Sequence, residues 1–574
     1  MPGIFGYFDP NDLSDDRGNR VIEKMRDMLV YRKGCKSEPF FHKYGVYAGY
    51  CAPCFEDIDE YAVEKSDIIC WFDGEIYNTD ELSGSKPSAV SGGSVKELII
   101  RAYKTDTLND FLRRADGYFS AVIYDSGKRQ LKLLIDRFGF RHIFYTKYNK
   151  KFLWASEYKA FLAEPDFKID VNRQSVEEFM KFGILCEDRT WLNGVQLLNP
   201  ATILTYDMKT DSVQAERYWS PDEISRFALT DNTDFREYYE EWGRLFKLSV
   251  AKRTMGDERI GLTLSGGLDS RAILAAMPIS GDKINAVTLG GDKCDDVRFA
   301  AMAAKIKGAN HKIFPLKVDG WFERACLGIW ATDGALNVSS QLGIEHLSAI
   351  SNILGVSLNG IGGGRMQGGR VVGTSEHYEF DSIKNGVPGL QMIRRRMLRP
   401  GFRLDESFFK IRMPFFGNEL YNFVTALPHD VKKRGFFYNG ALLHNFAGYY
   451  KKIPWQQAGV PISLPLLLFR VGTVYKKALS RLKRKLHGMG LPIYDSKLYF
   501  NFSEIFNSDV NHKLMENILS DKKAFYPQYM SGEYLAVNPA RKGVNIEKIC
   551  GILTFEIFMR QLNEPAFRPN QLSD

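Results

Sequence analysis

The chain has 574 residues, a net charge of +8, 44% hydrophobic residues and 13% aromatic residues. At roughly 150 residues per domain, this length predicts about two to four domains. The composition excludes a disordered protein, and the mild charge permits anionic ligands without favouring a nucleic-acid partner. No apolar run approaches the ~20 residues that span a bilayer, so we expect no integral membrane association.

The start of the chain and its cysteines narrow the class of protein further. Residues 1–6 lack a basic stretch followed by an apolar one, so we expect a cytoplasmic protein. Only Cys51 and Cys54, among eight cysteines, have metal-ligand spacing, and no second pair completes a zinc site. We therefore predict reduced thiols and no structural transition metal.

Short apolar runs with a period near two dominate residues 1–215 and predict a β-rich layer. Helical stretches at 21–30, 93–103 and 175–182 add an α component, so we predict an α+β sandwich. The β-type runs are 45–49, 68–72, 118–124, 131–135, 143–148, 152–155 and 201–206.

Six short motifs follow one another in this part of the chain. They are G-I-F-G at 3–6, D-G-E-I-Y-N at 73–78, D-G-Y-F-S at 116–120, D-R-F-G at 136–139, A-S-E-Y-K-A at 155–160 and Y-W at 218–219. Their succession resembles the glutaminase domain of asparagine synthetase, which has an N-terminal-nucleophile hydrolase fold. The resemblance covers nearly the whole chain and thins after about residue 460.

The residues that would hydrolyse glutamine in such a domain are replaced. Pro2 stands where the resemblance implies the nucleophilic cysteine, and proline offers neither a thiol nor a primary amine. Asp73 replaces an oxyanion-donating asparagine, and a carboxylate repels an oxyanion. The stretch 49–51 reads G-Y-C and lacks the implied glutamine-binding arginine. We expect no glutamine hydrolysis and a degenerate glutamine pocket at Pro2, Asp73, Gly74, Glu75 and Asp116.

A polar stretch at 216–232 predicts a linker, and residues 233–574 are predicted to form a second domain. Helix-period sequence at 235–252 precedes a β-type run at 260–264, the loop S-G-G-L-D-S at 265–270 and a helix. Further β-type runs at 284–289 and 312–316, separated by an alanine-rich helix, indicate a doubly wound parallel sheet. Ligands of such sheets bind at the carboxyl ends of strands.

The loop at 265–270 is suited to phosphate, because its small residues expose backbone N–H groups at a helix N-terminus. Asp269 would repel a phosphate unless Mg²⁺ bridged them, and the Gly-Lys-Ser/Thr of a Walker loop is absent. The loop resembles the pyrophosphate-binding loop of ATP pyrophosphatases; a structural glycine-rich turn is the alternative. The resemblance implies adenine on the backbone of Leu264 and Leu289, Mg²⁺ on Asp269, and phosphates at Ser265, Gly266, Gly267, Asp269 and Ser270.

A second glycine-rich stretch, N-G-I-G-G-G-R at 359–365, follows the next β-type run. By resemblance, Asn359 and Gly360 face ATP, because glycines allow close backbone approach. The resemblance also implies an acidic pair, including a second Mg²⁺ ligand, where Gly364 and Arg365 stand. Either Arg365 and Arg370 clamp phosphate oxygens directly, or the site has lost catalysis and keeps nucleotide affinity.

A catalytic lysine is implied by the resemblance near residues 454–461, where Gln456 and Gln457 stand instead. Lys451 and Lys452 are close in sequence, and Lys452 is our candidate replacement. The predicted catalytic residues are therefore Asp269, Arg365 and Lys452. Trp330, Asp333 and Asp381 are weaker candidates for the substrate pocket.

The stretch 474–486 places Tyr475, Leu479, Leu482 and Leu486 on one helical face, with basic residues opposite. In the more common arrangement of this kind, the apolar stripe packs on the core beneath a solvated face. A helix that docks on a membrane surface or a peptide has the same pattern.

The resemblance implies ATP-dependent amide formation through an acyl-adenylate, with release of AMP and pyrophosphate. Ammonia or a substrate amine would be the nucleophile, because the glutaminase residues are lost. The pattern is closest to relatives without the N-terminal cysteine, such as β-lactam synthetases and lasso-peptide cyclases. We expect a small-molecule or peptide carboxylate as substrate, with a homodimer or a precursor-peptide partner also open. The alternative is a nucleotide-binding pseudoenzyme that acts as a scaffold or regulator.

Overall fold

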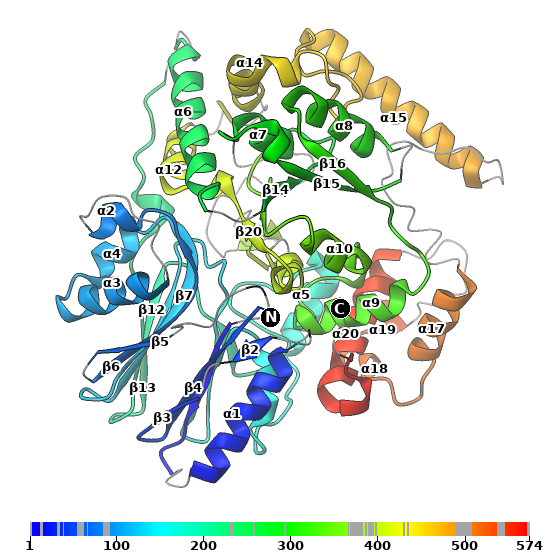
Figure 1. The fold of residues 1–574 in the computed structure, drawn as a ribbon. Coiled ribbons are helices and arrows are strands. Elements are labelled where there is room, and N and C mark those ends of the chain that lie inside the picture. Colours follow the sequence, from blue (N-terminus) through cyan, green and yellow to red (C-terminus); the bar gives the residue numbers. More distant parts are fainter. Residues whose placement is uncertain are drawn as a thin grey trace.

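The computed structural model describes residues 3–11, 15–30, 32, 35–37, 40–53, 55, 62–65, 67–83, 92–229, 233–256, 259–291, 294–364, 367, 383–384, 387–388, 395–396, 399–428, 431–432, 436–488, 508–535 and 546–570. Two antiparallel sheets form the N-terminal part, and a parallel sheet flanked by helices follows (Figure 1). This arrangement confirms the predicted fold class, an α+β sandwich followed by an α/β domain.

The first sheet of the sandwich has the order β11-β9-β10-β1-β4-β2, with β3 also paired to β4. Its strands are β1 (Gly3–Phe8), β2 (Lys36–Ser37), β3 (Phe41–Lys43), β4 (Val46–Ala52), β9 (Phe144–Tyr148), β10 (Lys151–Ala155) and β11 (Val195–Leu197). The second sheet has the order β13-β12-β8-β7-β6-β5. Its strands are β5 (Ala62–Lys65), β6 (Ile68–Ile76), β7 (Gly117–Asp125), β8 (Gln130–Ile135), β12 (Thr202–Asp207) and β13 (Ser212–Arg217).

Side chains from both sheets interdigitate in the core of the sandwich, including Trp71, Tyr124 and Trp154. Helix α1 (Asp15–Leu29) packs on β1 and β4, and α3 (Gly92–Lys104) packs on β5 and β6, so helices cover both outer faces. A strand between two covered faces is buried throughout, as β7 is at every position. Each predicted β-type run lies on a strand of the structure, and the three predicted helices correspond to α1, α3 and α5 (Arg173–Phe182).

Periodicity did not predict every strand of the sandwich, and β1 and β13 are two that it missed. β1 reads G-I-F-G-Y-F and is buried on both faces, whereas the edge strand β13 is exposed along nearly all its length. The ladder between β13 and β12 continues to Arg217, and Tyr218 and Trp219 are buried. Residues 216–219 therefore belong to the sandwich, and the predicted linker begins too early.

The second domain is built on a parallel sheet of order β16-β15-β14-β17-β20. From β14 the chain moves outward through β15 and β16, then returns to the other side of β14 through β17. The strands are β14 (Ile260–Thr263), β15 (Asn285–Leu289), β16 (Asn310–Phe314), β17 (Val356–Leu358) and β20 (Lys410–Arg412). The strand order reverses between β14 and β17, which is where doubly wound sheets bind ligands.

Helices surround this sheet and also return to the sandwich. They include α6 (Arg236–Arg253), α7 (Asp269–Ala276), α8 (Asp295–Lys307), α9 (Trp321–Ala331), α10 (Leu347–Ser351), α12 (Asn418–Ala426), α14 (Phe436–Tyr450), α15 (Leu466–Gly488), α17 (Asp509–Leu519) and α20 (Ile546–Asn563). Helix α20 packs on α9 and on α5 of the sandwich, so the last helix joins the two domains. None of the helices that the structure describes combines the length and apolar character needed to cross a bilayer.

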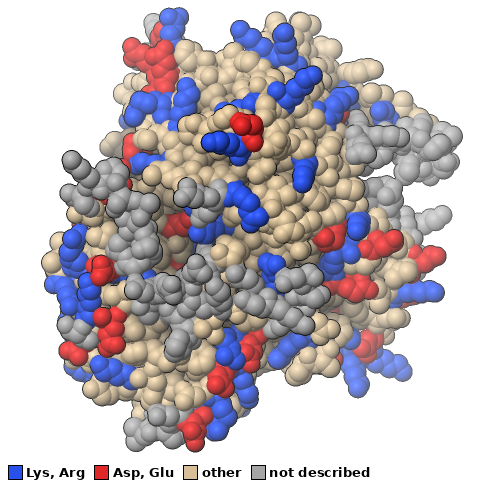
Figure 2. All heavy atoms as spheres, in the orientation of Figure 1, with Lys and Arg blue, Asp and Glu red and all other residues tan. Residues whose placement is uncertain are grey.

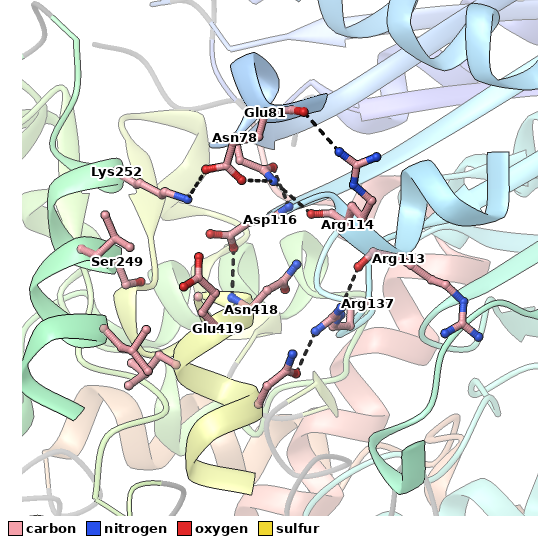
Figure 3. A pocket seen from close by; sticks show the side chains of 15 residues that line it. Asn78, Glu81, Arg113, Arg114, Asp116, Arg137, Ser249, Lys252, Asn418 and Glu419 are labelled. Carbon is pink, nitrogen blue, oxygen red and sulfur yellow. Dashed lines mark hydrogen bonds and ion pairs between the residues drawn. The ribbon is translucent and has the colours of Figure 1, made fainter. Parts of the chain in front are cut away.

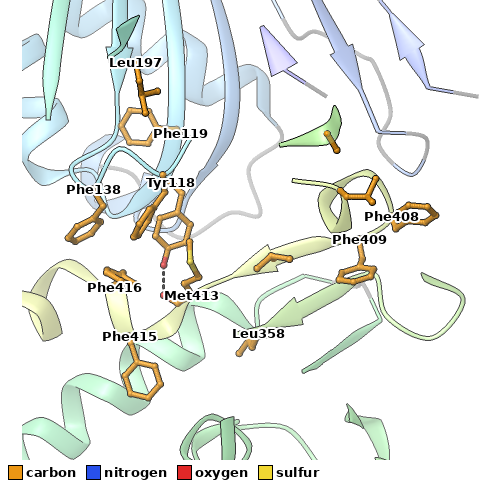
Figure 4. Close-up of a cluster of buried hydrophobic side chains, with 14 of the residues drawn as sticks. Tyr118, Phe119, Phe138, Leu197, Leu358, Phe408, Phe409, Met413, Phe415 and Phe416 are labelled. Carbon is orange, nitrogen blue, oxygen red and sulfur yellow. Dashed lines mark hydrogen bonds between the residues drawn. The ribbon is translucent and has the colours of Figure 1, made fainter. Parts of the chain in front are cut away.

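The two domains share a continuous hydrophobic core (Figure 4). The ring of Phe416 in the second domain lies 5.2 Å from that of Phe138 and 4.7 Å from that of Phe140 in the sandwich. The hydroxyl of Tyr118 donates to the carbonyl oxygen of Met413 across the same contact. Aromatic pairs of this kind add to the free energy of apolar burial, so these contacts stabilise the interface.

Candidate functional site

Two glycine-lined loops meet around Asp269, at the point where the strand order reverses. The 265–268 loop leaves the carboxyl end of β14, and the 359–364 loop leaves the neighbouring parallel strand β17. The Gly364 N–H donates to Asp269 Oδ1 at 2.9 Å. A Cβ atom on Gly363 would lie 2.2 Å from Asp269 Cγ, so the loops fit together because that residue has no side chain. The residues predicted to bind the phosphates, with Asn359 and Gly360, therefore lie together.

The loop at 265–270 holds its own backbone amides in place. Ser265 N–H donates to Ser270 Oγ at 3.1 Å, and Gly267 N–H donates to Ser265 Oγ at 3.2 Å. The Gly266 N–H donates to a carboxylate, Asp296 Oδ1, at 2.9 Å. Burial raises the pKa of Asp296. A phosphate that took the Gly266 amide would have to displace the Asp296 carboxylate.

Asp269 has a second donor that the sequence did not suggest. The hydroxyl of Tyr438, on α14, donates to Asp269 Oδ1 at 2.8 Å. Tyr438 is fully buried, and burial together with the Asp269 charge raises its pKa well above 10. The phenol therefore stays protonated and orients the carboxylate of Asp269.

A buried arginine lies directly beneath the loop. Arg271, in the first turn of α7, donates through NH2 to the carbonyl oxygens of Gly266 and Pro454, both at 2.9 Å. Its NH1 donates to the carbonyl oxygens of Tyr449 and Ile453 at 3.3 Å. Within the described part of the chain its hydrogen bonds all go to carbonyls. The guanidinium thus places a positive charge, without a carboxylate partner in those bonds, against a loop suited to phosphate. In the sequence, only the position of Arg271 directly after the S-G-G-L-D-S motif suggests that it lies near the loop.

The segment with the missing lysine also lies on the loop. The Gln456 N–H donates to the Gly266 carbonyl oxygen at 3.2 Å. Lys476, on α15, donates through Nζ to the Gln456 carbonyl oxygen at 2.8 Å and forms an ion pair with Asp295. Lys452 is exposed, so the lysine that the structure brings next to this segment is Lys476. Arg365 and Arg370 lie outside the described residues.

The Leu264 backbone, predicted with Leu289 to hold adenine, is hydrogen-bonded to the neighbouring strand, and the adenine contact stays a prediction. The Leu264 N–H donates to the Val287 carbonyl oxygen at 2.8 Å, and the Leu264 carbonyl accepts from Thr288 Oγ1 at 2.8 Å. Pairing with β15 continues past the end of β14 and uses this amide. Leu289 ends β15 and is half-buried at the same edge of the sheet.

The residues of the expected glutamine pocket are engaged with other side chains. The Tyr50 hydroxyl donates to Asp73 Oδ1 at 3.2 Å, and Arg141 lies 3.7 Å from the other Asp73 oxygen. Gly74 has a φ of +125°, and its position faces the carbonyl oxygen of Tyr118 so closely that a Cβ would lie 2.1 Å away. Pro2 lies outside the described residues. The structure therefore shows Asp73 paired within the fold.

Glu75 and Asp116 join the two domains. Glu75 receives two hydrogen bonds from Arg412 of β20, Nε to Oε2 at 2.8 Å and NH2 to Oε1 at 2.6 Å. Burial raises the pKa of Glu75, but the Arg412 charge outweighs this effect and holds the pKa at about 2. Asp116 pairs with the fully buried Arg253 at 2.9 Å. These carboxylates act as interdomain contacts.

The A-S-E-Y-K-A motif supplies a further buried contact between the domains. Lys159 Nζ donates to Asp333 Oδ1 at 3.0 Å, to the Trp330 carbonyl oxygen at 2.8 Å and to the Glu157 carboxylate. Arg403 lies 3.4 Å from the other oxygen of Asp333. Trp330 and Asp333 thus serve the interface, and Asp381 lies outside the described residues.

A pocket of about 260 Å³ opens between the sandwich and helices α6 and α12 (Figure 3). Its lining shares no residue with the 265–270 loop. Several of its charged groups are paired: Lys252 with Glu81 at 2.8 Å, and Arg113 with Glu223 at 2.6 Å. Because these charges are compensated, we assign the pocket no ligand.

Comparison with protein families matches residues 1–219 to the glutamine amidotransferase domain and residues 241–404 to asparagine synthase. The glutamine-hydrolysing asparagine synthetase 3 of Bacillus subtilis is 30% identical over 288 residues, 48% of this chain and 45% of that protein. Asparagine synthetase 2 of the same organism is 26% identical over 367 residues, 60% of this chain and 49% of the relative. The chain thus spans about half the length of these curated relatives.

Among solved structures, the allosteric regulatory enzyme of purine biosynthesis aligns with 54% of this chain and 80% of its own. The sequence identity is 13% and the TM-score is 0.27, values too low to bear on the fold or the function.

Proposed function

We propose that this chain, which joins the amidotransferase and synthase domains of the glutamine-hydrolysing asparagine synthetase family, is an ATP-dependent carbon–nitrogen ligase that does not hydrolyse glutamine. The observation that carries the proposal is the meeting of the 265–270 and 359–364 loops around Asp269 at the carboxyl ends of β14 and β17. This edge of a doubly wound sheet is where nucleotides bind.

The proposed reaction has two steps. A carboxylate oxygen of the substrate attacks the α-phosphorus of ATP, the bond to the β-phosphate oxygen breaks, and pyrophosphate leaves. The nitrogen of ammonia or of a substrate amine then attacks the acyl carbon and gives up a proton. AMP leaves with the former carboxylate oxygen, and the amide remains. The carboxylate belongs to a small molecule or a peptide, and a homodimer or a precursor-peptide partner remains part of the proposal.

In this reaction the chain contributes positioning and positive charge. The loop amides and the hydroxyls of Ser265 and Ser270 would orient the phosphates, and Arg271 would offset their charge from below. We transfer the role proposed for Lys452 to Lys476, whose ammonium contacts the segment that covers Gly266. The Asp296 carboxylate would leave the Gly266 amide when phosphate enters.

A Mg²⁺ site fits Asp269, because this ion is usually bound by one or two carboxylates together with substrate phosphates. Within the described residues no group of three or more His, Cys, Asp or Glu side chains could hold a metal, so most ligands would be phosphate oxygens and water. When bound, the ion would neutralise phosphate charge.

Three observations support the loss of glutamine hydrolysis. Asp73 is paired with Tyr50 and Arg141, Glu75 is held by Arg412, and Asp116 is held by Arg253. Carboxylates held in these contacts offer no hydrogen-bond donor to the oxyanion that glutamine hydrolysis forms. Incubation with glutamine and ATP should yield no enzyme-dependent glutamate, and glutamate formation at ordinary amidotransferase rates would refute this part.

A nucleotide-binding scaffold without catalysis is the second candidate. The Asp296 carboxylate on the Gly266 amide and the glutamine at position 456 favour it, because both reduce the charge stabilisation that a ligase needs. Exchange of labelled pyrophosphate into ATP, across a panel of carboxylic acids, separates the candidates. A ligase shows exchange with at least one acid, and that exchange is lost in Asp269→Ala but kept in the exposed control Asp319→Ala. Binding of ATP and Mg²⁺ by calorimetry, with no exchange for any acid, favours the scaffold.

A further inference from the structure

Helix α15 presents an apolar stripe to solvent. Leu467 is 74% exposed, Val474 66% and Tyr475 68%. Leu466, Leu468, Val471 and Leu482 are exposed as well. At 3.6 residues per turn, positions 467, 471, 474, 475, 478 and 482 lie along one side of the helix.

The opposite side of α15 already packs on the protein. The ring of Phe469 stacks on Trp455 with centroids 6.3 Å apart, and Ser480 is buried. A Cβ on Gly472 would lie 2.6 Å from Val460 Cγ1, so helix and segment are in close contact there. The sequence expectation that Tyr475 and Leu482 face the core is therefore wrong, because residues on the other side of the helix, such as Phe469 and Ser480, face the protein.

The charges on α15 have one sign. The helix carries Arg470, Lys476, Lys477, Arg481, Lys483, Arg484 and Lys485 and no acidic residue. Arg470, Lys477 and Arg481 are exposed and lie along the border of the apolar stripe. Figure 1 shows α15 at the edge of the molecule, and Figure 2 shows Lys and Arg side chains among uncharged surface in the same region.

We propose that the outer face of α15 docks on an anionic membrane surface. An aliphatic stripe bordered by Lys and Arg is the pattern of helices that lie in the interface plane of a bilayer. At 1.5 Å per residue the 23 residues of α15 extend about 35 Å, enough for several turns to contact lipid at once. A helical protein partner would be expected to face acidic as well as basic residues at the edges of the stripe, and α15 has no acidic residue.

This placement links the membrane surface to the candidate nucleotide site. Lys476 on the inner side of α15 contacts Gln456, whose N–H donates to Gly266 in the 265–270 loop. A docked helix would therefore hold that loop close to the lipid headgroups. The proposal itself does not depend on the ligase reaction, and it is tested without substrates.

The test is co-flotation of the full chain with two kinds of vesicle, phosphatidylcholine alone and phosphatidylcholine with about 30% phosphatidylserine. We expect binding to the anionic vesicles that weakens with added salt, and little binding to the neutral ones. Replacing Lys477 and Arg481 together by Gln should weaken binding about 30-fold, because each basic residue near an anionic surface contributes about fivefold. The combined variant Leu467→Asp, Val471→Asp and Val474→Asp should abolish it.

The control is Val510→Asp on α17, which alters a valine with 64% exposure and should leave binding unchanged. All altered side chains are exposed, so thermal unfolding of each variant should match the parent. Three results overturn the proposal: no binding to either vesicle, equal binding to both, or binding that the α15 variants do not weaken. A dimer that the triple aspartate variant dissociates, without vesicle binding, would assign the stripe to a second copy of the chain.

Discussion

The ion pair between Glu75 and Arg412 should stabilise the interface between the domains by a measurable amount. Two hydrogen bonds of 2.8 and 2.6 Å join these side chains, and Glu75 is 23% exposed. The pKa of Glu75 falls from its ordinary 4.5 to about 2. This difference corresponds to about 3 kcal/mol in the free energy of unfolding, at ~1.4 kcal/mol for each pH unit. We expect Glu75→Gln to lose about this much at pH 7.

The pH dependence follows from the direction of the pKa change. Because the pKa of Glu75 is lower in the folded chain, its stabilisation is complete above about pH 4.5 and is lost as the pH falls through about 2. The difference between parent and Glu75→Gln should therefore shrink to less than half at pH 3. Urea unfolding followed by tryptophan fluorescence and by far-UV circular dichroism gives the free energy, provided that the two transitions coincide.

Glu81→Gln is the matched control, because Glu81 also joins the sandwich to the second domain, through Lys252 at 2.8 Å. Its side chain is 58% exposed, and exposed pairs contribute at most about 1 kcal/mol. Equal losses in the two variants, or a Glu75→Gln loss as large at pH 3 as at pH 7, would refute the reasoning.

Three further substitutions test other parts of the structure. Gly363→Ala places a methyl group 2.2 Å from Asp269 Cγ in the candidate nucleotide site, so ATP affinity should fall at least tenfold by calorimetry. Gly448→Ala, with open space around it, should leave the affinity unchanged. Arg271→Met removes the buried guanidinium and leaves carbonyl oxygens without donors. We expect the free energy of unfolding, measured in urea, to fall by about 3 kcal/mol and ATP binding to weaken. Full ATP affinity in this variant would contradict the role proposed for Arg271. Lys159→Met leaves two buried carboxylates without their ammonium and should lower the free energy of unfolding by about 3–5 kcal/mol. The control Lys128→Met, at an exposed lysine, should change it by less than about 1 kcal/mol. Similar losses in both variants would exclude the buried network as a stabilising contact.

Local patterns predicted the four inner strands of the second sheet and the strands β14, β15 and β16 of the second domain. The short apolar runs at 68–72, 118–124 and 131–135 identify strands, because such runs bounded by turn residues are typical of strands in a covered sheet. The small residues between β14 and α7 likewise identify a loop suited to phosphate. Periodicity does not predict β1, since two glycines, which disfavour strands, interrupt its short apolar run.

The sequence predicted the loops of the candidate site but only some of its polar and charged side chains. Asp269 and the two glycine-rich stretches are visible in the sequence, because loops that approach a ligand need small residues. Tyr438 and Lys476 are not, since each reaches the site from a helix remote in sequence. Nearness in sequence favours Lys452, but the structure leaves this lysine exposed.

The amino-acid sequence by itself determined the inner strands of the second sheet, the two-domain order and the position of the loop suited to phosphate, because these depend on short-range periodicity and on residue size. Only the tertiary structure decided which partners the side chains have. Glu75 and Asp116 join the two domains, and the apolar stripe on α15 faces solvent. The reason is physical. A side chain's charge state and exposure depend on partners that packing brings from distant segments, and no local pattern encodes those partners.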